Sequence, residues 1–287
     1  MRETLIEPTP ALPEPGLHLP WQERREHFRA GLQEQIPAGV GADEVAAHFD
    51  GMPAHYWERV TLGDLRWGLA TIHGFLRLVS AGEVPATMPL VDWRPGAESG
   101  QTRIMLCTWD RHGLLAKAAA ALSAVRLNIF EADVFTRLDN LVLDVFCVTD
   151  AERPGSPANP ARLEELRFLV EGALSEPPRF ASVWACSRHK YLAAPSQFKA
   201  RIFFDNQSSA SATVLRVEAS DRLGLLYDIL QTAADSGLNI TQALVQTEAN
   251  VARDVFHLTD ENGQKISELL RLEELKRSLE AALTVAG

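Results

Sequence analysis

The stretch Asp110-Arg111-His112-Gly113-Leu114-Leu115 is repeated as Asp221-Arg222-Leu223-Gly224-Leu225-Leu226, 111 residues further along the chain. An Asn-Ile pair stands eighteen residues after each aspartate, at Asn128-Ile129 and Asn239-Ile240. A third pair of matching blocks follows at an offset of 110, at residues 144–150 and 254–260. Three matched blocks in one order at nearly one offset indicate an internal duplication.

Each repeat predicts the order strand, helix, strand, strand, helix. We expect these elements at 104–109, 114–125, 128–136, 141–149 and 162–175, and again at 213–219, 225–236, 239–247, 252–259 and 266–283. A β-α-β-β-α-β unit needs one more strand. We expect residues 201–205 to close the second unit and 180–186 the first, with the reverse assignment open. The predicted fold is α+β, with two such ferredoxin-like units packed against each other because a lone sheet leaves its edges and apolar surface exposed.

Proline and glycine mark the borders of the other segments. Five prolines make residues 1–20 an extended or disordered lead-in. Apolar residues at helical spacing predict a small helical segment over 21–80, with an N-cap at Thr61, and residues 81–100 are expected to be a linker. The two repeated domains are then expected at 101–187 and 198–287.

Composition excludes several classes of partner. The 287 residues carry a formal net charge of −10, which argues against nucleic acid and anionic membrane surfaces. No apolar run approaches the roughly 20 residues that span a bilayer. The three cysteines are far apart, and the histidines show no metal-ligand spacing, so we expect a reducing cytoplasm and no metal or other cofactor.

The repeated turns are the candidate ligand sites. Gly113 and Gly224 stand where a strand passes into a helix, and the free amides at that helix N-terminus suit a carboxylate. Asp110 and Asp221 can accept from an ammonium group. We expect Asn128 beside the Asp110 turn, and equally Asn239 beside Asp221, so that each unit holds both ends of a free amino acid. The remaining candidate binding residues are the neighbouring Leu114, Ile129, Leu225 and Ile240. A structural interpretation stays open, in which Asp caps, Gly turns and Asn tolerates a left-handed conformation.

The units resemble ACT domains, which are small regulatory modules that bind amino acids. Together they are similar to the C-terminal tandem ACT region of the uridylyltransferase/uridylyl-removing enzymes that modify the PII nitrogen-signalling protein. The resemblance rests on both Asp-Arg-X-Gly-Leu-Leu turns, on both Asn-Ile pairs and on the blocks at 143–146, 204–209 and 254–260. It implies one continuous sheet of about eight strands and a regulatory role in nitrogen metabolism with glutamine as ligand. It also implies a partner protein or a homodimer.

This chain departs from the family in two respects. His112 and Leu223 replace the proline that is usual in the turn, and neither the nucleotidyltransferase signature nor a His-Asp dipeptide is present. We therefore expect a non-catalytic sensor. We also expect tighter binding in the second unit, because Leu225, Leu226 and Tyr227 follow the family pattern while His112 is bulky.

Three alternatives remain at this stage. The chain can be a fragment or split subunit of a uridylyltransferase, or a structural dimerisation module. An RNA-binding function is disfavoured by the charge and by the lack of the aromatic strand motif.

Overall fold

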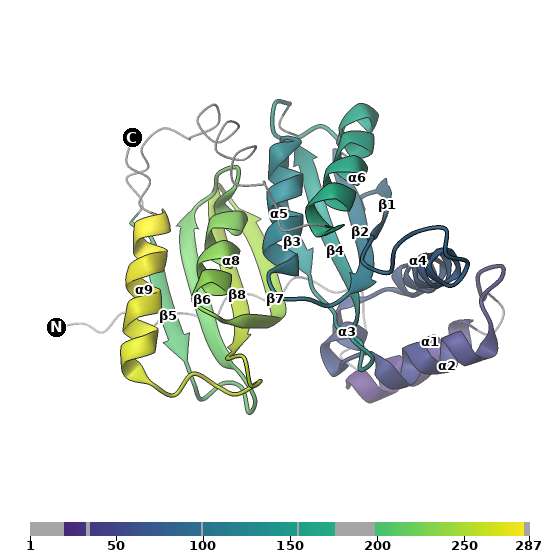
Figure 1. The fold of residues 1–287 in the computed structure, drawn as a ribbon, viewed down its shortest axis with the longest axis horizontal. Coiled ribbons are helices and arrows are strands. Elements are labelled where there is room, and N and C mark those ends of the chain that lie inside the picture. Colours follow the sequence, from purple (N-terminus) through teal and green to yellow (C-terminus); the bar gives the residue numbers. More distant parts are fainter. Residues whose placement is uncertain (1–19, 33–34, 99, 154, 176–198, 284–287) are drawn as a thin grey trace.

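A single sheet of eight strands organises the molecule. The structure is a computed structural model of the chain, and it describes residues 20–32, 35–98, 100–153, 155–175 and 199–283. Within them the strand order is β1-β2-β4-β3-β7-β8-β6-β5, and all neighbouring strands are antiparallel (Figure 1). The strands are β1 (Leu90–Pro95), β2 (Thr102–Trp109), β3 (Leu127–Asp133), β4 (Leu141–Asp150), β5 (Arg201–Asp205), β6 (Thr213–Ser220), β7 (Asn239–Glu248) and β8 (Val251–Thr259). The helices are α1 (Trp21–Leu32), α2 (Ala42–Gly51), α3 (Ala54–Arg59), α4 (Leu62–Ser80), α5 (Leu114–Ala124), α6 (Pro160–Ser175), α8 (Leu225–Asp235) and α9 (Leu269–Leu283).

The two repeats form two units that share this sheet. Strands β1–β4 with α5 and α6 make the first unit, and β5–β8 with α8 and α9 make the second. They join at the centre, where β3 pairs with β7 and Ala132 lies opposite Val245. Helices α5, α6, α8 and α9 all lie on one face of the sheet (Figure 1). The predicted side-by-side arrangement of two ferredoxin-like units is confirmed.

The closing strands come before their units in the chain. Strand β5 pairs with β6, which confirms that residues 201–205 close the second unit. In the first unit β1 pairs with β2 at the edge of the sheet. Because β1 lies within residues 81–100, the prediction that this whole segment is a linker was wrong. Val91 is the only buried residue of β1, so the strand has no apolar alternation to distinguish it from a linker. The segment 180–186, expected to close this unit, lies outside the described residues.

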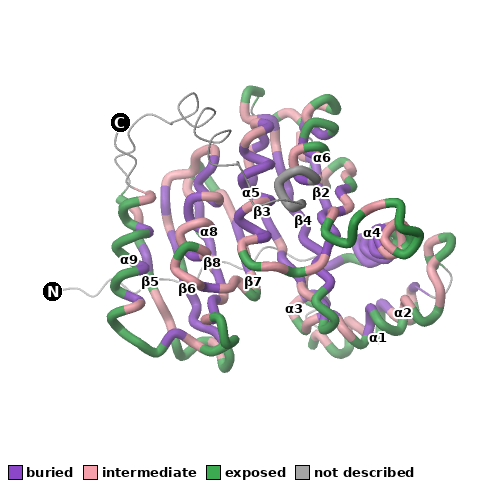
Figure 2. The backbone as a smooth tube through the Cα atoms, viewed as in Figure 1, coloured by how far each residue is buried: buried purple, intermediate pink, exposed green. Residues whose placement is uncertain are grey.

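The first unit is buried on both faces of its sheet. Ile104 and Leu106 of β2 lie in the core beneath the four sheet-covering helices, whereas Met105 and Cys107 lie in a second core with the N-terminal helices. Cysteines at 107 and 147 are buried, as expected. In the second unit, β8 instead alternates buried with partly exposed residues, which is typical of a sheet covered on one face (Figure 2).

The helical segment is stabilised by aromatic packing and is joined to the sheet by an ion pair. Trp57 is fully buried and stacks on Phe49 with ring centroids 4.8 Å apart, so tryptophan packs this segment as expected. Thr61 caps α4 by accepting a hydrogen bond from the Asp64 amide, which confirms the predicted cap. Arg59 ties the segment to β3 through Asp133, with 2.8 Å between Nε and Oδ1. No helix among the described residues combines the length and the apolar character that crossing a bilayer requires.

Close contact of α4 with the sheet predicts a sensitive position at Gly68. A Cβ atom there would lie 2.9 Å from Leu143 Cδ2, inside a fully packed core. We expect Gly68→Leu to lower the free energy of unfolding by about 1–3 kcal/mol through overpacking. Gly63→Ala is the control, because its Cβ would meet only Thr61 Oγ1 at 3.6 Å. Chemical denaturation measures both variants, and equal stabilities would contradict the assigned contact.

Candidate functional site

The turn of the first unit gives the amides at the start of α5 no side-chain cap that could accept their hydrogen bonds. Gly113 is the N-cap of α5 and has φ of 72°, in the left-handed region that glycine adopts without strain. It has no side chain to cap the helix, and the Leu114 amide bonds back to the Arg111 carbonyl oxygen. The first amides of a helix have no intrahelical acceptor. The α5 N-terminus, at Leu115 and Ala116, therefore offers donors and a partial positive charge.

The strand that meets this turn comes from the other unit. Helix α5 runs back along the sheet for 11 residues, or about 16 Å, so β3 begins at the far end of the sheet from the turn. Strand β7 is antiparallel to β3, so its first residues reach the end where the turn lies. Asn239 is thus beside the Asp110 turn, and Asn128 is not. The prediction that the aspartate and the asparagine of one unit share a pocket was wrong, because each aspartate shares its pocket with the asparagine of the other unit.

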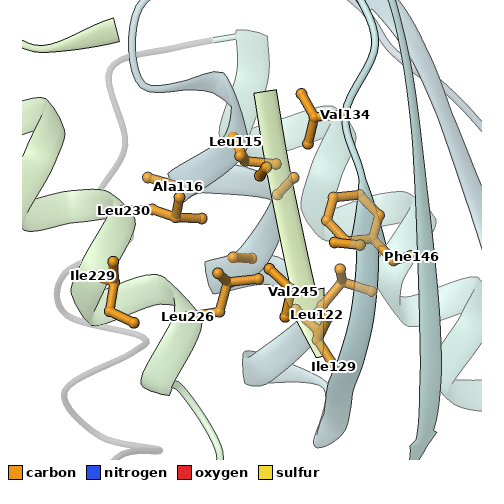
Figure 3. Packing of buried hydrophobic residues seen from close by; sticks show 14 of the residues in the cluster. Leu115, Ala116, Leu122, Ile129, Val134, Phe146, Leu226, Ile229, Leu230 and Val245 are labelled. Atoms are coloured by element: carbon orange, nitrogen blue, oxygen red, sulfur yellow. The ribbon is translucent and has the colours of Figure 1, made fainter. Parts of the chain in front are cut away.

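A large cavity lies at this junction of the two units. Its volume is about 540 Å³, within the range of roughly 300–1,000 Å³ typical of small-molecule sites. Its apolar wall includes Leu115, Ala116 and Leu230, which lie close together where α5 packs on α8 (Figure 3). The complete lining is Asp110, Arg111, His112, Gly113, Leu114, Leu115, Ala116, Val134, Thr136, Val142, Asp144, Leu230, Ala234, Leu238, Asn239, Ile240, Thr241 and Thr259. We call this the first site.

His112 bridges the two units at the first site. Its Nδ1 lies 3.1 Å from Asn239 Oδ1, and its Nε2 lies 3.2 Å from the Ala234 carbonyl oxygen. The residue that replaces the usual proline therefore has a definite role, because it ties the turn to α8 and β7. The sequence shows His112 only as a bulky departure from the turn pattern and contains no signal for this contact.

The corresponding site of the second turn is closed. It is lined by the other five predicted residues, Asp221, Gly224 and Leu225 from one unit and Asn128 and Ile129 from the other. Its volume is about 10 Å³, at the lower limit for one water molecule. Asn128 Nδ2 donates to Asp221 Oδ2 at 3.0 Å, which joins the two groups that a ligand would need. We call this the second site. The volumes favour the first site for binding, the opposite of the sequence-based expectation.

Each site contains a buried aspartate that sequence analysis did not select. Burial raises the pKa of the Asp144 carboxyl well above its usual value, nearby Asp110 adds to the shift, and the Phe135 amide opposes it. Burial likewise raises the pKa of Asp254 to about 8, with a smaller contribution from Asp221. Each residue lies at the same place in a strand of its repeat, so the duplication places a buried carboxyl in both sites.

Acidic groups in the first site do not form a metal centre. Among the described residues there is no group of three or more His, Cys, Asp or Glu side chains placed to hold a metal ion. The first site instead combines two carboxyl groups, Asp110 and Asp144, with the Arg111 guanidinium and a helix N-terminus. This arrangement can bind a small molecule that carries both charges.

Comparison with known proteins agrees with this architecture. Residues 208–286 match the family model described as "ACR family N-terminal ACT domain". The first unit repeats the strand and helix order of that region. The chain is a tandem ACT-domain protein. Both ACT domains contribute to each of the two sites, because each turn faces the other domain's strand.

The curated relatives of the tandem ACT protein are much longer enzymes. It is 30% identical over 276 residues to the "Bifunctional uridylyltransferase/uridylyl-removing enzyme" of Azospirillum brasilense, covering 93% of this chain and 28% of the relative. It is 34% identical over 203 residues to the enzyme of the same name from Gluconobacter oxydans, covering 68% of this chain and 21% of the relative. The chain therefore spans less than a third of these relatives. Among solved structures, aspartate kinase from Synechocystis matches with a TM-score of 0.37 and 15% identity, over 64% of this chain and 27% of that one.

Proposed function

We propose that this tandem ACT protein is an amino-acid sensor that binds one ligand per chain in the first site, with L-glutamine as the expected ligand. The observation that carries the proposal is the 540 Å³ cavity between the Gly113 turn and the start of β7. An uncapped helix N-terminus supplies donors for a carboxylate, and Asp110 and Asp144 supply acceptors for an ammonium group. Three threonines, Thr136, Thr241 and Thr259, line the same cavity and suit a neutral amide side chain.

A ligand in the first site contacts both ACT domains, and this supports a regulatory role. The turn and α5 belong to one domain, whereas Asn239, Ile240 and Thr241 belong to the other. Binding at such a junction stabilises the arrangement of the two domains that it fits best. The chain then acts by reporting ligand concentration to a partner, and not by catalysis of its own.

The names of the relatives support a proposal for the activity that the sensor controls. They are named for uridylyl transfer and removal, and the chain matches about a quarter of their length. We propose that the chain regulates such an activity toward a PII-type protein in nitrogen metabolism. The alternative, a regulatory subunit or fragment of a uridylyltransferase, is favoured by the 93% coverage of the chain by one relative and uses the same site.

Isothermal titration of the purified chain against the twenty amino acids tests the proposal. We expect saturable binding of L-glutamine with a stoichiometry of about one per chain, because the second site has no room for an amino acid. D-glutamine is the matched control and should bind more weakly. Two ligands per chain would contradict the closure of the second site, and no binding by any amino acid would refute the sensor function.

A further inference from the structure

Asp144 is in an unusual place for a carboxyl group. It lies in the middle of β4, between Val142 and Phe146 on the face that α5 covers, and 1% of it is exposed. A buried carboxyl costs stability unless its oxygens find partners. Close packing alone would be served better by an apolar residue, so this position calls for a partner.

One oxygen of Asp144 has no partner within the protein. The Phe135 backbone amide serves the carboxyl group on one side. Oδ1 is fully buried and has no hydrogen-bond partner among the described residues. Asp144 also lines the first site. An unsatisfied acceptor at the wall of a cavity is suited to a donor that arrives with a ligand.

The equivalent residue of the second unit makes a useful comparison. Asp254 is buried to a similar degree, and its Oδ1 accepts a hydrogen bond from the Gln246 amide at 3.3 Å, as the Asp144 carboxyl accepts one from the Phe135 amide. The second site beside it is closed by the Asn128–Asp221 hydrogen bond. The duplicated aspartates thus each have one main-chain amide partner, and they differ in their surroundings, because only Asp144 has an open cavity beside it.

The N-terminus of α5 supplies the complementary half of the first site. Gly113 provides no side-chain cap, and Leu115 and Ala116 at the start of α5, where helix amides lack intrahelical acceptors, line the cavity. Arg111 adds a cationic group to the same lining. A ligand with a carboxylate and a donor close to each other can therefore occupy both halves at once.

We propose that Asp144 Oδ1 binds the α-ammonium group of a zwitterionic amino acid whose carboxylate is held by the amides at the start of α5. This rests on the proposed function and deepens it, since it assigns the two charged ends of the ligand to two structural features. Asp110, exposed at the end of β2, is then a rim residue and not the principal amine partner.

The test compares two probes on three proteins by isothermal titration. The probes are L-glutamine and 4-carbamoylbutanoate, which is glutamine without its amino group. The proteins are the parent chain, Asp144→Asn and the matched control Asp254→Asn. We expect the parent and the control to prefer glutamine by about tenfold or more, as for hydrogen bonds to a charged group. Asp144→Asn should lose about tenfold or more in affinity for glutamine and should bind both probes almost equally.

Each outcome separates the two levels of the proposal. A parent chain that binds no amino acid overturns the sensor function and this assignment together. A parent that binds glutamine, with an Asp144→Asn variant that keeps the full preference for glutamine, overturns only the role of Asp144. Asn keeps the shape of Asp, and circular dichroism confirms that the variant is folded. Asp144→Ser replaces it if Asn does not fold, and the same loss of preference is expected.

Discussion

Gly113→Val should abolish ligand binding, whereas Gly224→Val should leave the affinity nearly unchanged. Both glycines have left-handed backbones, with φ of 72° and 82°, so a branched side chain strains both turns by about 1–3 kcal/mol. A Cβ on Gly113 meets no protein atom within 4 Å, and Gly113 lines the first site. The valine side chain would therefore occupy space next to the α5 amides that the ligand carboxylate needs. We expect at least about a hundredfold loss of affinity for L-glutamine.

Thermal melts of the same samples separate binding from folding. Both variants should lose stability through similar backbone strain, and Gly224→Val should lose more because its side chain enters the closed second site. Gly224→Val is therefore the control for strain in a turn outside the open cavity. Binding should be measured at a temperature where both remain folded. Normal binding by Gly113→Val would place the ligand elsewhere, and loss of binding by Gly224→Val alone would assign it to the second site.

Duplication made most of the fold predictable. Each element was seen twice, and the apolar alternation of strands such as β8 and the helical spacing in α8 gave the same order in both units. Strand β1 was not predicted because a short edge strand needs little burial. Val91 is its only buried residue, and the chain on either side of the strand contains proline and glycine. Pairing partners of edge strands depend on tertiary contacts, which local patterns do not contain.

The sequence selected residues that line the two cavities, but it did not give their pairing. All ten predicted residues line one of the two sites, five in each. Their division between sites depends on which end of the sheet each strand starts from, and this follows from the antiparallel contact of β3 with β7. The open or closed state of each site depends on single side-chain contacts, such as Asn128 with Asp221 and His112 with Asn239. Sequence periodicity carries no information on such contacts.

One signal for the buried carboxyls was present in the sequence. Asp144 and Asp254 occupy the same place in the two repeats, Asp144 within a run of apolar strand residues and Asp254 between Arg253 and Val255. An aspartate is rarely placed in a buried strand without a reason. The matched position could therefore have identified Asp144 as a candidate binding residue, although only the structure shows that an open cavity lies beside Asp144 and a closed one beside Asp254.

Asp254→Asn should stabilise the protein by an amount that grows as the pH rises from about 4 to about 8. In the unfolded chain the carboxyl ionises near its ordinary pKa of 3.8, whereas burial raises the pKa of the folded protein to about 8. Between these values the folded state holds a proton that the unfolded state has released, so the parent loses stability as the pH rises. The loss is on the order of 1 kcal/mol for each pH unit in this window. Asparagine is neutral throughout and keeps the acceptor for the Gln246 amide.

Denaturation of the parent and Asp254→Asn at several pH values measures this difference. Asp205→Asn serves as the control of opposite sign, because hydrogen bonds from Ser208 and Gln207 lower the pKa of Asp205 to about 2. The stability that Asp205 contributes is present above its unfolded pKa and is lost as the pH falls, so removing it should cost stability at neutral pH. A difference between Asp254→Asn and the parent that stays constant from pH 4 to pH 8 would show that Asp254 is already ionised in the folded protein. In that case the carboxyl must have a cationic partner or solvent access that the structure does not give it.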